Sequence, residues 1–279
     1  MSAAERMITL LFGGTALLVF LFASAPPELP ESDVDGRQQE ATIPVSKIVA
    51  ILAAENDIAR SLYTSEIVGA GKAVGLQFSE HWQDEGIEAG PLPALFLRAT
   101  ATTVRELTPD LGLFLGSAFP IASSNLFSDS QLPAFRQIME THEAVMFADE
   151  STGQFTAMYP DFASVDACVT CHNRHPDSPK SDWRIGDIMG ATTWTYPRRQ
   201  LSAPEAMQLI TSLRSGFIRT YTEYLERAKG FSRPPVIGDR WPSDGDYCLP
   251  SADAFRMEFC KRAALQTSTA LLNMFDATE

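Results

Sequence analysis

Two cysteines and a histidine are the residues of this sequence best suited to chemistry. Cys168, Cys171 and His172 stand in the segment ACVTCHNRHPDSPKSDW and form a C-x-x-C-H pattern. Two thiols at this spacing can form thioether bonds to the two vinyl groups of a heme, and the histidine that follows then lies beside the iron. The pattern therefore predicts one covalently attached c-type heme, with His172 as its proximal ligand.

A C-x-x-C pair has other uses, which the surrounding sequence does not favour. It also occurs as the redox pair of thioredoxin-like proteins, as half of a zinc site and as a plain disulfide loop. The thioredoxin pair belongs to a βαβ pattern, which is absent here. The remaining cysteines, Cys248 and Cys260, lie far downstream without zinc-ligand spacing. No G-x-S-x-G or H-E-x-x-H motif occurs either, so we expect a protein that is not an enzyme.

An apolar segment near the N-terminus indicates export. Residues 7–25, MITLLFGGTALLVFLFASA, follow an arginine and approach the ~20 residues that span a bilayer. The final ASA resembles a signal-peptidase site, but the proline directly after it disfavours cleavage. We therefore expect residues 1–27 to be an uncleaved anchor and 28–43 a polar tether, with the domain facing the periplasm from the cytoplasmic membrane. Cleavage to a soluble form is the alternative.

Composition limits the partners. The formal net charge of -13 disfavours nucleic acid, because a polyanion would be repelled, and it suits a basic redox partner. Hydrophobic residues make up 45% of the 279 residues, which is enough to fill one good-sized core.

Hydrophobic periodicity predicts an α+β domain over residues 44–230. Helical spacing runs from Pro44 to about Val68, and its apolar face packs on the core or on a second subunit in a homodimer. A second long helix begins at the capping box Ser202-x-x-Glu205 and ends at Gly230. Between the two helices the pattern predicts a short helix at 131–141 and a small antiparallel sheet with helices on one face, its strands near 111–119, 143–148, 154–159 and 187–196.

Residues 231–279 read as a loop followed by a final helix from about Ser251 to Phe275. In an oxidising compartment we expect Cys248 and Cys260 to form a disulfide that pins this helix to its loop. Closing such a loop stabilises a protein by ~3 kcal/mol in the chain-entropy model. A thiolate ligand to the heme from either cysteine is the alternative.

The segment ACVTCHNRHPDSPKSDWRIGDIMG resembles the heme-binding core of PAS-like heme-c sensor domains, which occur in bacterial chemoreceptors, histidine kinases and nucleotide cyclases. Those domains carry the signature C-x-x-C-H-N-x-H-P-D-S-P-K-x-D-W-x-x-G-D. The stretches LYTSEIV, GPLPALF and LFLGSAFPI also look like landmarks of that family, so the similarity covers about residues 45–230. The resemblance implies a PAS-like antiparallel sheet flanked by long N-terminal and C-terminal helices, one covalent heme, and redox or small-ligand sensing.

The sequence departs from that family in three ways. Ala94-Leu95 stands where the family commonly has Ala-Thr, a change that we expect to affect packing. Met189 stands where an arginine is common, which leaves Arg174, Lys180 and Arg184 as candidates to face the heme carboxylates. The C-terminal helix is too charged to be a second membrane span, and we find no output module. Any signal or electron must therefore pass to a separate redox, respiratory or signalling partner.

The sixth iron ligand decides between electron transfer and sensing. His81, in FSEHWQDEG, is our first candidate. His142, Met146 and Met158 are alternatives, as is an open or water-bound position. We expect His175 to orient a turn or a heme carboxylate. Two protein ligands favour electron transfer, because a saturated iron exchanges electrons with little reorganisation, whereas a weak or absent sixth ligand favours sensing. The sequence favours a membrane-anchored monoheme cytochrome, with a heme-based sensor subunit as the alternative.

Overall fold

The structure, a computed structural model, describes residues 42–150, 152–242 and 247–276, with side chains described as far as residue 270. The expected anchor at 1–27 and nearly all of the tether at 28–43 lie outside these residues. Among the helices of the described ranges, none is both long enough and apolar enough to cross a membrane.

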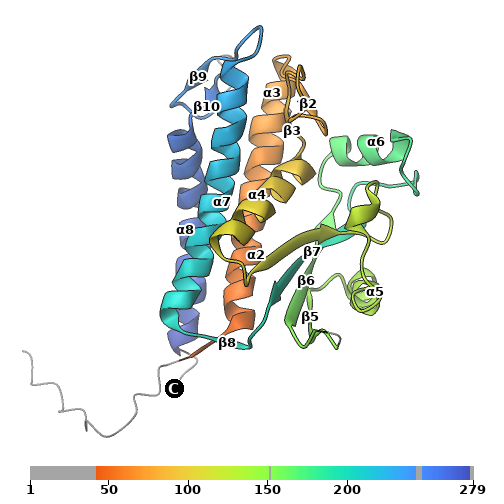
Figure 1. The fold of residues 1–279 in the computed structure, drawn as a ribbon, viewed down its shortest axis with the longest axis vertical. Helices are drawn as coiled ribbons and strands as arrows, with labels where there is room; N and C mark the ends of the chain where they lie inside the picture. Colours follow the sequence, from red (N-terminus) through yellow and green to blue (C-terminus); the bar gives the residue numbers. More distant parts are fainter. Residues whose placement is uncertain (1–41, 151, 243–246, 277–279) are drawn as a thin grey trace, which may run out of the picture. The chain divides into compact units, whose positions relative to one another are not determined.

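The described chain is an α+β unit in which long helices pack beside one antiparallel sheet (Figure 1). Its helical segments are α2 (Val45–Leu62), the π-helix η1 (Tyr63–Gly69), α3 (Ala70–Ala73), α4 (Pro93–Leu107), the 3-10 turn η2 (Ser123–Asn125), α5 (Leu132–Thr141), α6 (Asp166–Arg174), α7 (Ala203–Lys229) and α8 (Ala252–Asp276). Its strands are β1 (Ile43–Pro44), β2 (Phe78–Ser79), β3 (Gly90–Pro91), β4 (Gly112–Gly116), β5 (Val145–Ala148), β6 (Phe155–Phe162), β7 (Ile188–Tyr196), β8 (Gln200–Leu201), β9 (Ile237–Gly238) and β10 (Leu249–Pro250).

The expected sheet is confirmed, with strand order β4-β7-β6-β5 and antiparallel pairing throughout. The expectation of helices on one face only was wrong. Alternate residues of β6 enter different cores: Ala157 packs in the cluster shared with α2 and α7, whereas Met158 packs in a second cluster with Phe135 and Ile138 of α5. Because successive side chains of a strand point to opposite faces, α5 covers the face that α2 and α4 leave open.

The two long predicted helices form where their patterns place them. Pro44 precedes α2, whose buried stripe includes Ile48, Val49 and Leu52. The capping box at the start of α7 is present in both directions: the Ser202 hydroxyl accepts from the Glu205 backbone N–H, and the Glu205 carboxylate accepts from the Ser202 backbone N–H. Helix α4, which the sequence analysis did not predict, packs against α7 and β4.

Helix α8 shares the main core rather than forming an appendage. Phe255 and Phe259 are fully buried, and the Phe255 ring stacks on Tyr221 of α7 with centroids 4.3 Å apart. In Figure 1, α2, α7 and α8 run side by side, and α8 contacts both of the other helices. The described residues from 42 onward accordingly cluster as one compact unit.

The expected disulfide between Cys248 and Cys260 is not present, since both residues are free thiols. Cys248 lies just before β10, whereas Cys260 lies eight residues after the start of α8, about 12 Å along the helix at 1.5 Å per residue. The Sγ of Cys248 instead lies 3.4 Å from the Arg240 carbonyl oxygen, which accepts its hydrogen bond.

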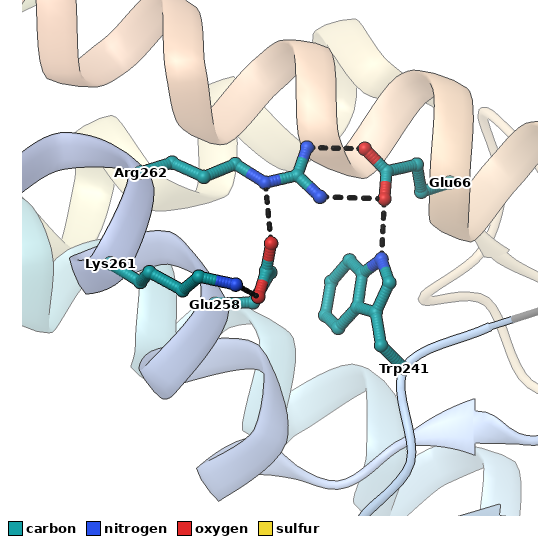
Figure 2. A network of polar contacts seen from close by, with 5 residues as sticks. All are labelled: Glu66, Trp241, Glu258, Lys261 and Arg262. Carbon is teal, nitrogen blue, oxygen red and sulfur yellow. Dashed lines mark hydrogen bonds and ion pairs between the residues drawn. The ribbon is translucent and has the colours of Figure 1, made fainter.

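A polar network fastens α8 to the π-helix that continues α2 (Figure 2). Arg262 of α8 contacts both carboxylate oxygens of Glu66, with Nη2 2.8 Å from Oε2, and also donates to Glu258 at 2.7 Å. The indole of Trp241 donates to the same Glu66 carboxylate. The Arg262 hydrogen bonds lower the pKa of Glu66, with Trp241 contributing in the same direction, so this carboxylate stays charged.

Candidate functional site

The C-x-x-C-H residues lie on α6, a short helix in the connection between β6 and β7 (Figure 1). Residues three and four positions apart share a helix face, so Cys168, Cys171 and His172 are presented together. No residue of α6 is fully buried: Cys168 is half-buried and Cys171 is exposed. The three side chains therefore stand on one accessible surface, as attachment of a planar cofactor requires.

The loop after α6 is fastened back onto the helix by one asparagine. Asn173 Nδ2 donates to the Trp183 carbonyl oxygen at 2.9 Å, and the Trp183 backbone N–H donates to Asn173 Oδ1 at 2.8 Å. The Trp183 side chain is buried in a small cluster with Ala163, Met189 and Cys168. Its ring also meets the His172 ring edge-on, with centroids 6.5 Å apart. This clamp fixes the end of the helix that carries the histidine.

The two nitrogens of His172 have different environments. Nδ1 is buried and lacks a hydrogen-bond partner among the described residues, which leaves Nε2 as the nitrogen open to a ligand. Burial lowers the pKa of His172, and His175 lowers it further, although Asp161 acts in the opposite direction. The neutral ring that results is the form that binds a metal. These residues fit an iron-bound imidazole.

The thiol of Cys171 is not activated as a nucleophile. Burial raises its pKa, with the charge of Glu80 adding to the effect, and only Lys72 opposes it. The thiolate, which is the nucleophilic form, is therefore disfavoured at this position.

Residues from distant parts of the chain surround α6, and the sequence analysis missed them. Arg60 of α2 donates from Nη1 to Asp161 Oδ1 of β6 at 2.7 Å. Asp161 lies at a register shift between β6 and β7, and such bulges redirect side chains. Burial acts to lower the pKa of Arg60, but Asp161 raises it above its usual value overall. No local motif marks Arg60 or Asp161, since each is an isolated charge in the sequence.

The three predicted carboxylate-binding residues have different surroundings. Arg174 and Arg184 are exposed, and the backbone N–H of Arg184 donates to Asp187 Oδ2 at 2.8 Å within a turn. Lys180 contacts Asp182, and its Nζ lies 4.6 Å from the centroid of the Trp183 ring. Lys180 is thus the one of the three that packs against a residue of the α6 clamp.

The candidate sixth ligands occupy different surroundings. The His81 side chain is 65% exposed and lies 3.3 Å from Asp84 and 3.6 Å from Glu80. Glu80 in turn lies 3.4 Å from His175 Nε2, so the segment that carries His81 reaches the end of α6. The His142 ring lies near the end of β6, with its centroid 6.3 Å from that of Phe162.

The other histidine and the two candidate methionines also have different surroundings. His175 Nδ1 accepts from the Asp177 backbone N–H at 3.2 Å, which agrees with a role in orienting the turn. Met158 is fully buried in the core beside α5, and Met146 is 44% exposed.

Comparison with known proteins gives one family. A family model described as Tll0287-like matches residues 40–197, which is more than half of the chain. A solved structure described as that of the cyanobacterial heme-protein Tll0287 is 12% identical, covering 57% of this chain and 97% of that chain with a TM-score of 0.33. This structural similarity is too low to support a conclusion about the fold. No curated protein matches.

Proposed function

Because the chain belongs to the Tll0287-like family, we propose that it is a heme-binding protein in which Cys168 and Cys171 attach one c-type heme and His172 is the proximal ligand. The observation that carries the proposal is the shared face of α6, where both thiols and an imidazole with an open Nε2 stand together. When bound, the heme supplies reversible one-electron exchange at its iron.

The protein's own residues have defined tasks in this proposal. Cys168 and Cys171 form the thioether bonds, and the reciprocal hydrogen bonds of Asn173 and Trp183 keep α6 in place. Burial keeps His172 neutral so that Nε2 can bind the iron, while Nδ1 retains the proton. Lys180, Arg174 and Arg184 remain our candidates for the heme carboxylates, with Lys180 first because it packs on Trp183.

We further propose a PAS-like domain that acts in electron transfer, tethered to the periplasmic side of the cytoplasmic membrane by residues 1–27. Its net charge of -13 suits a basic redox partner in solution or in the membrane. We assign it no catalytic reaction of its own.

A heme-staining assay on denatured protein tests attachment directly. We expect the full chain, exported together with heme-ligation machinery, to retain heme after acid-acetone extraction and denaturing electrophoresis. Cys168→Ala and Cys171→Ala should each weaken that retention, and the double variant should abolish it. Cys260→Ala, which removes a thiol far from α6, is the matched control and should retain heme as the native chain does. A native chain without covalent heme contradicts the proposal.

Heme-based sensing through a partner is the second candidate function. One observation favours it: the ring of His81, our first candidate for the sixth ligand, is exposed and engaged with Asp84 and Glu80. A weakly held sixth ligand leaves room for an external ligand or for a change with redox state. Rapid carbon monoxide binding by a ferrous, high-spin wild-type protein supports sensing, whereas a low-spin heme that excludes carbon monoxide supports electron transfer.

A further inference from the structure

We propose that one-electron reduction at the α6 site is coupled to uptake of one proton by the Asp57 carboxylate. The proposal rests on the proposed heme function. It arises from a charge cluster, formed by Asp57, Arg60 and Asp161, that neither the motif nor the family match identifies.

The cluster contains two carboxylates and one guanidinium. Arg60 and Asp57 lie three residues apart on α2 and therefore share a face, and Arg60 is hydrogen-bonded to Asp161 of β6 at 2.7 Å. The side chains of Arg60 and Asp161 are only 18% and 22% exposed. Since the cluster holds one positive guanidinium and two negative carboxylates, its net charge is minus one when all three groups are ionised. Asp57, which lacks the direct ion pair, is the member free to change its charge.

The cluster lies within electrostatic reach of the heme-attachment helix. Strand β6 ends at Phe162 and α6 begins at Asp166, so Asp161 stands just before the helix. The charge of Asp161 acts on the His172 ring, and Cys168 acts on Arg60. The register shift at Asp161 and Phe162 is where β6 departs from regular pairing. Asp57 interacts with Arg60 and Asp161, the two residues that also interact with α6, so we infer that a change of charge at an iron bound to His172 would alter the proton affinity of Asp57.

The other polar groups around Asp57 do not compete for the proton. Asn56 Nδ2 donates to Asp57 Oδ1 at 3.3 Å and does not titrate. The Tyr159 hydroxyl of β6 is buried without a partner in the described chain, and burial together with the charge of Asp57 raises its pKa to about 12. Tyr159 therefore stays protonated at physiological pH. The Asp161 carboxylate is already engaged by its direct hydrogen bond from Arg60.

Asp57 is placed to exchange a proton with solvent. Its side chain is exposed on one side, yet the surrounding protein removes part of its hydration. This desolvation raises its pKa, Asp161 raises it further, and Arg60 and Asn56 act in the opposite direction. A carboxyl already shifted towards neutrality needs only a modest additional field to bind a proton.

Charge balance gives the direction of the coupling. When a one-electron donor reduces the iron, the site loses one positive charge, and the proton affinity of Asp57 rises because less positive charge opposes protonation. An Asp57 oxygen then binds one proton from solvent, which restores the total charge. By linkage, protonation of Asp57 must favour reduction to the same extent. The midpoint potential therefore falls as pH rises through the range in which Asp57 titrates, with full coupling equal to about 59 mV for each tenfold change in proton concentration.

Spectroelectrochemical titration of the heme-loaded full chain between about pH 4.5 and 8 tests this coupling. In wild type we expect a potential that falls with pH. Asp57→Asn should give a flat profile at the level that wild type reaches at low pH, because the amide imitates the protonated carboxyl. Asp57→Glu retains a titratable group and should restore the slope. Asp253→Asn removes an equal charge from an exposed carboxylate on α8 and should leave the wild-type profile unchanged.

The outcomes separate this inference from the proposed function. If the wild-type chain retains covalent heme but its potential is independent of pH, or if Asp57→Asn keeps the wild-type slope, the inference is wrong and the heme function stands. If no covalent heme is present, the proposed function itself is wrong. A thermal melt of each variant by circular dichroism confirms that the compared proteins are folded.

Discussion

His172 combines an accessible ring nitrogen with a buried one. In most metal sites the second nitrogen of a ligating imidazole donates a hydrogen bond, which fixes the tautomer and the ring orientation. Here Nδ1 has no partner in the described chain, although the charge of Asp161 acts on the ring. Asp161 is thus the charged group that raises the basicity of the proposed ligand, and Arg60 contacts this carboxylate rather than the ring.

The sixth ligand gives a prediction at the same scale. If His81 binds the iron, wild type is low-spin in the ferric state and His81→Ala converts it to an accessible high-spin form, because an occupied sixth position must be vacated before an external ligand enters. His142→Ala is the matched variant and should leave the spectrum unchanged. Optical and EPR spectra of both variants test this. A high-spin form produced by His142→Ala alone would assign the ligand to His142 instead.

At the scale of elements, α2 is the helix that connects the proposed site to the rest of the protein. One end of it supplies Asp57 and Arg60, and the π-helix that follows is held to α8 by Glu66 and Arg262. Glu55, which precedes Asp57 and Arg60 on α2, is completely buried and accepts hydrogen bonds from Arg214 of α7 and Thr267 of α8. A single carboxylate therefore joins three helices.

Removing the Arg214 guanidinium from this junction should lower the free energy of unfolding of the protein. Arg214→Met leaves Glu55 buried without its charge partner, and loss of one member of a buried pair costs roughly 3–5 kcal/mol. Because the Arg214 side chain is 30% exposed, we expect the lower end of that range. Urea unfolding followed by circular dichroism measures the change.

A second arginine of α7, Arg219, provides the control for that measurement. Arg219 is 57% exposed and lies 3.9 Å from Glu106, so Arg219→Met should change the unfolding free energy by no more than about 0.5 kcal/mol. Equal effects from the two arginine variants would show that the Glu55 junction has no special importance.

At the scale of the whole molecule, the sheet, α2, α7 and α8 share one hydrophobic core. Phe255 packs on Tyr221 and also meets the ring of Phe96, with centroids 6.2 Å apart. The C-terminal helix therefore fills the interior of the same unit that carries the proposed site. Substitutions in the buried face of α8 should therefore change the stability of the whole unit towards unfolding.

Two substitutions on α8 test this shared core. Phe255→Ala should destabilise the protein by about 3–5 kcal/mol, because it removes a fully buried aromatic ring. Leu265→Ala removes a side chain that is 76% exposed and should have little effect. Thermal unfolding followed through the near-ultraviolet signal of the buried aromatic residues distinguishes the two. A silent Phe255→Ala would mean that α8 is dispensable for the core.

The sequence by itself determined the spacing of the residues that we propose to attach the heme, together with the strands of the four-stranded sheet and the helices α2, α5, α7 and α8. The C-x-x-C-H pattern is local, and on the helix α6 its spacing places Cys168, Cys171 and His172 on one face. The strands around β6 and β7 and the capped start of α7 are likewise recorded in short-range hydrophobic and turn patterns. Each of these features depends on neighbours a few residues away, which a single sequence displays.

Only the tertiary structure decided which distant residues meet. Arg60 and Asp161 are separated by 101 positions, and no periodicity or motif relates them. Cys248 and Cys260 are only twelve positions apart in the sequence, yet both are free thiols in the folded chain. The second covered face of the sheet depends on where α5 packs. Long-range charge pairing and helix packing are set by the summed fit of many elements, so a local pattern does not reveal them.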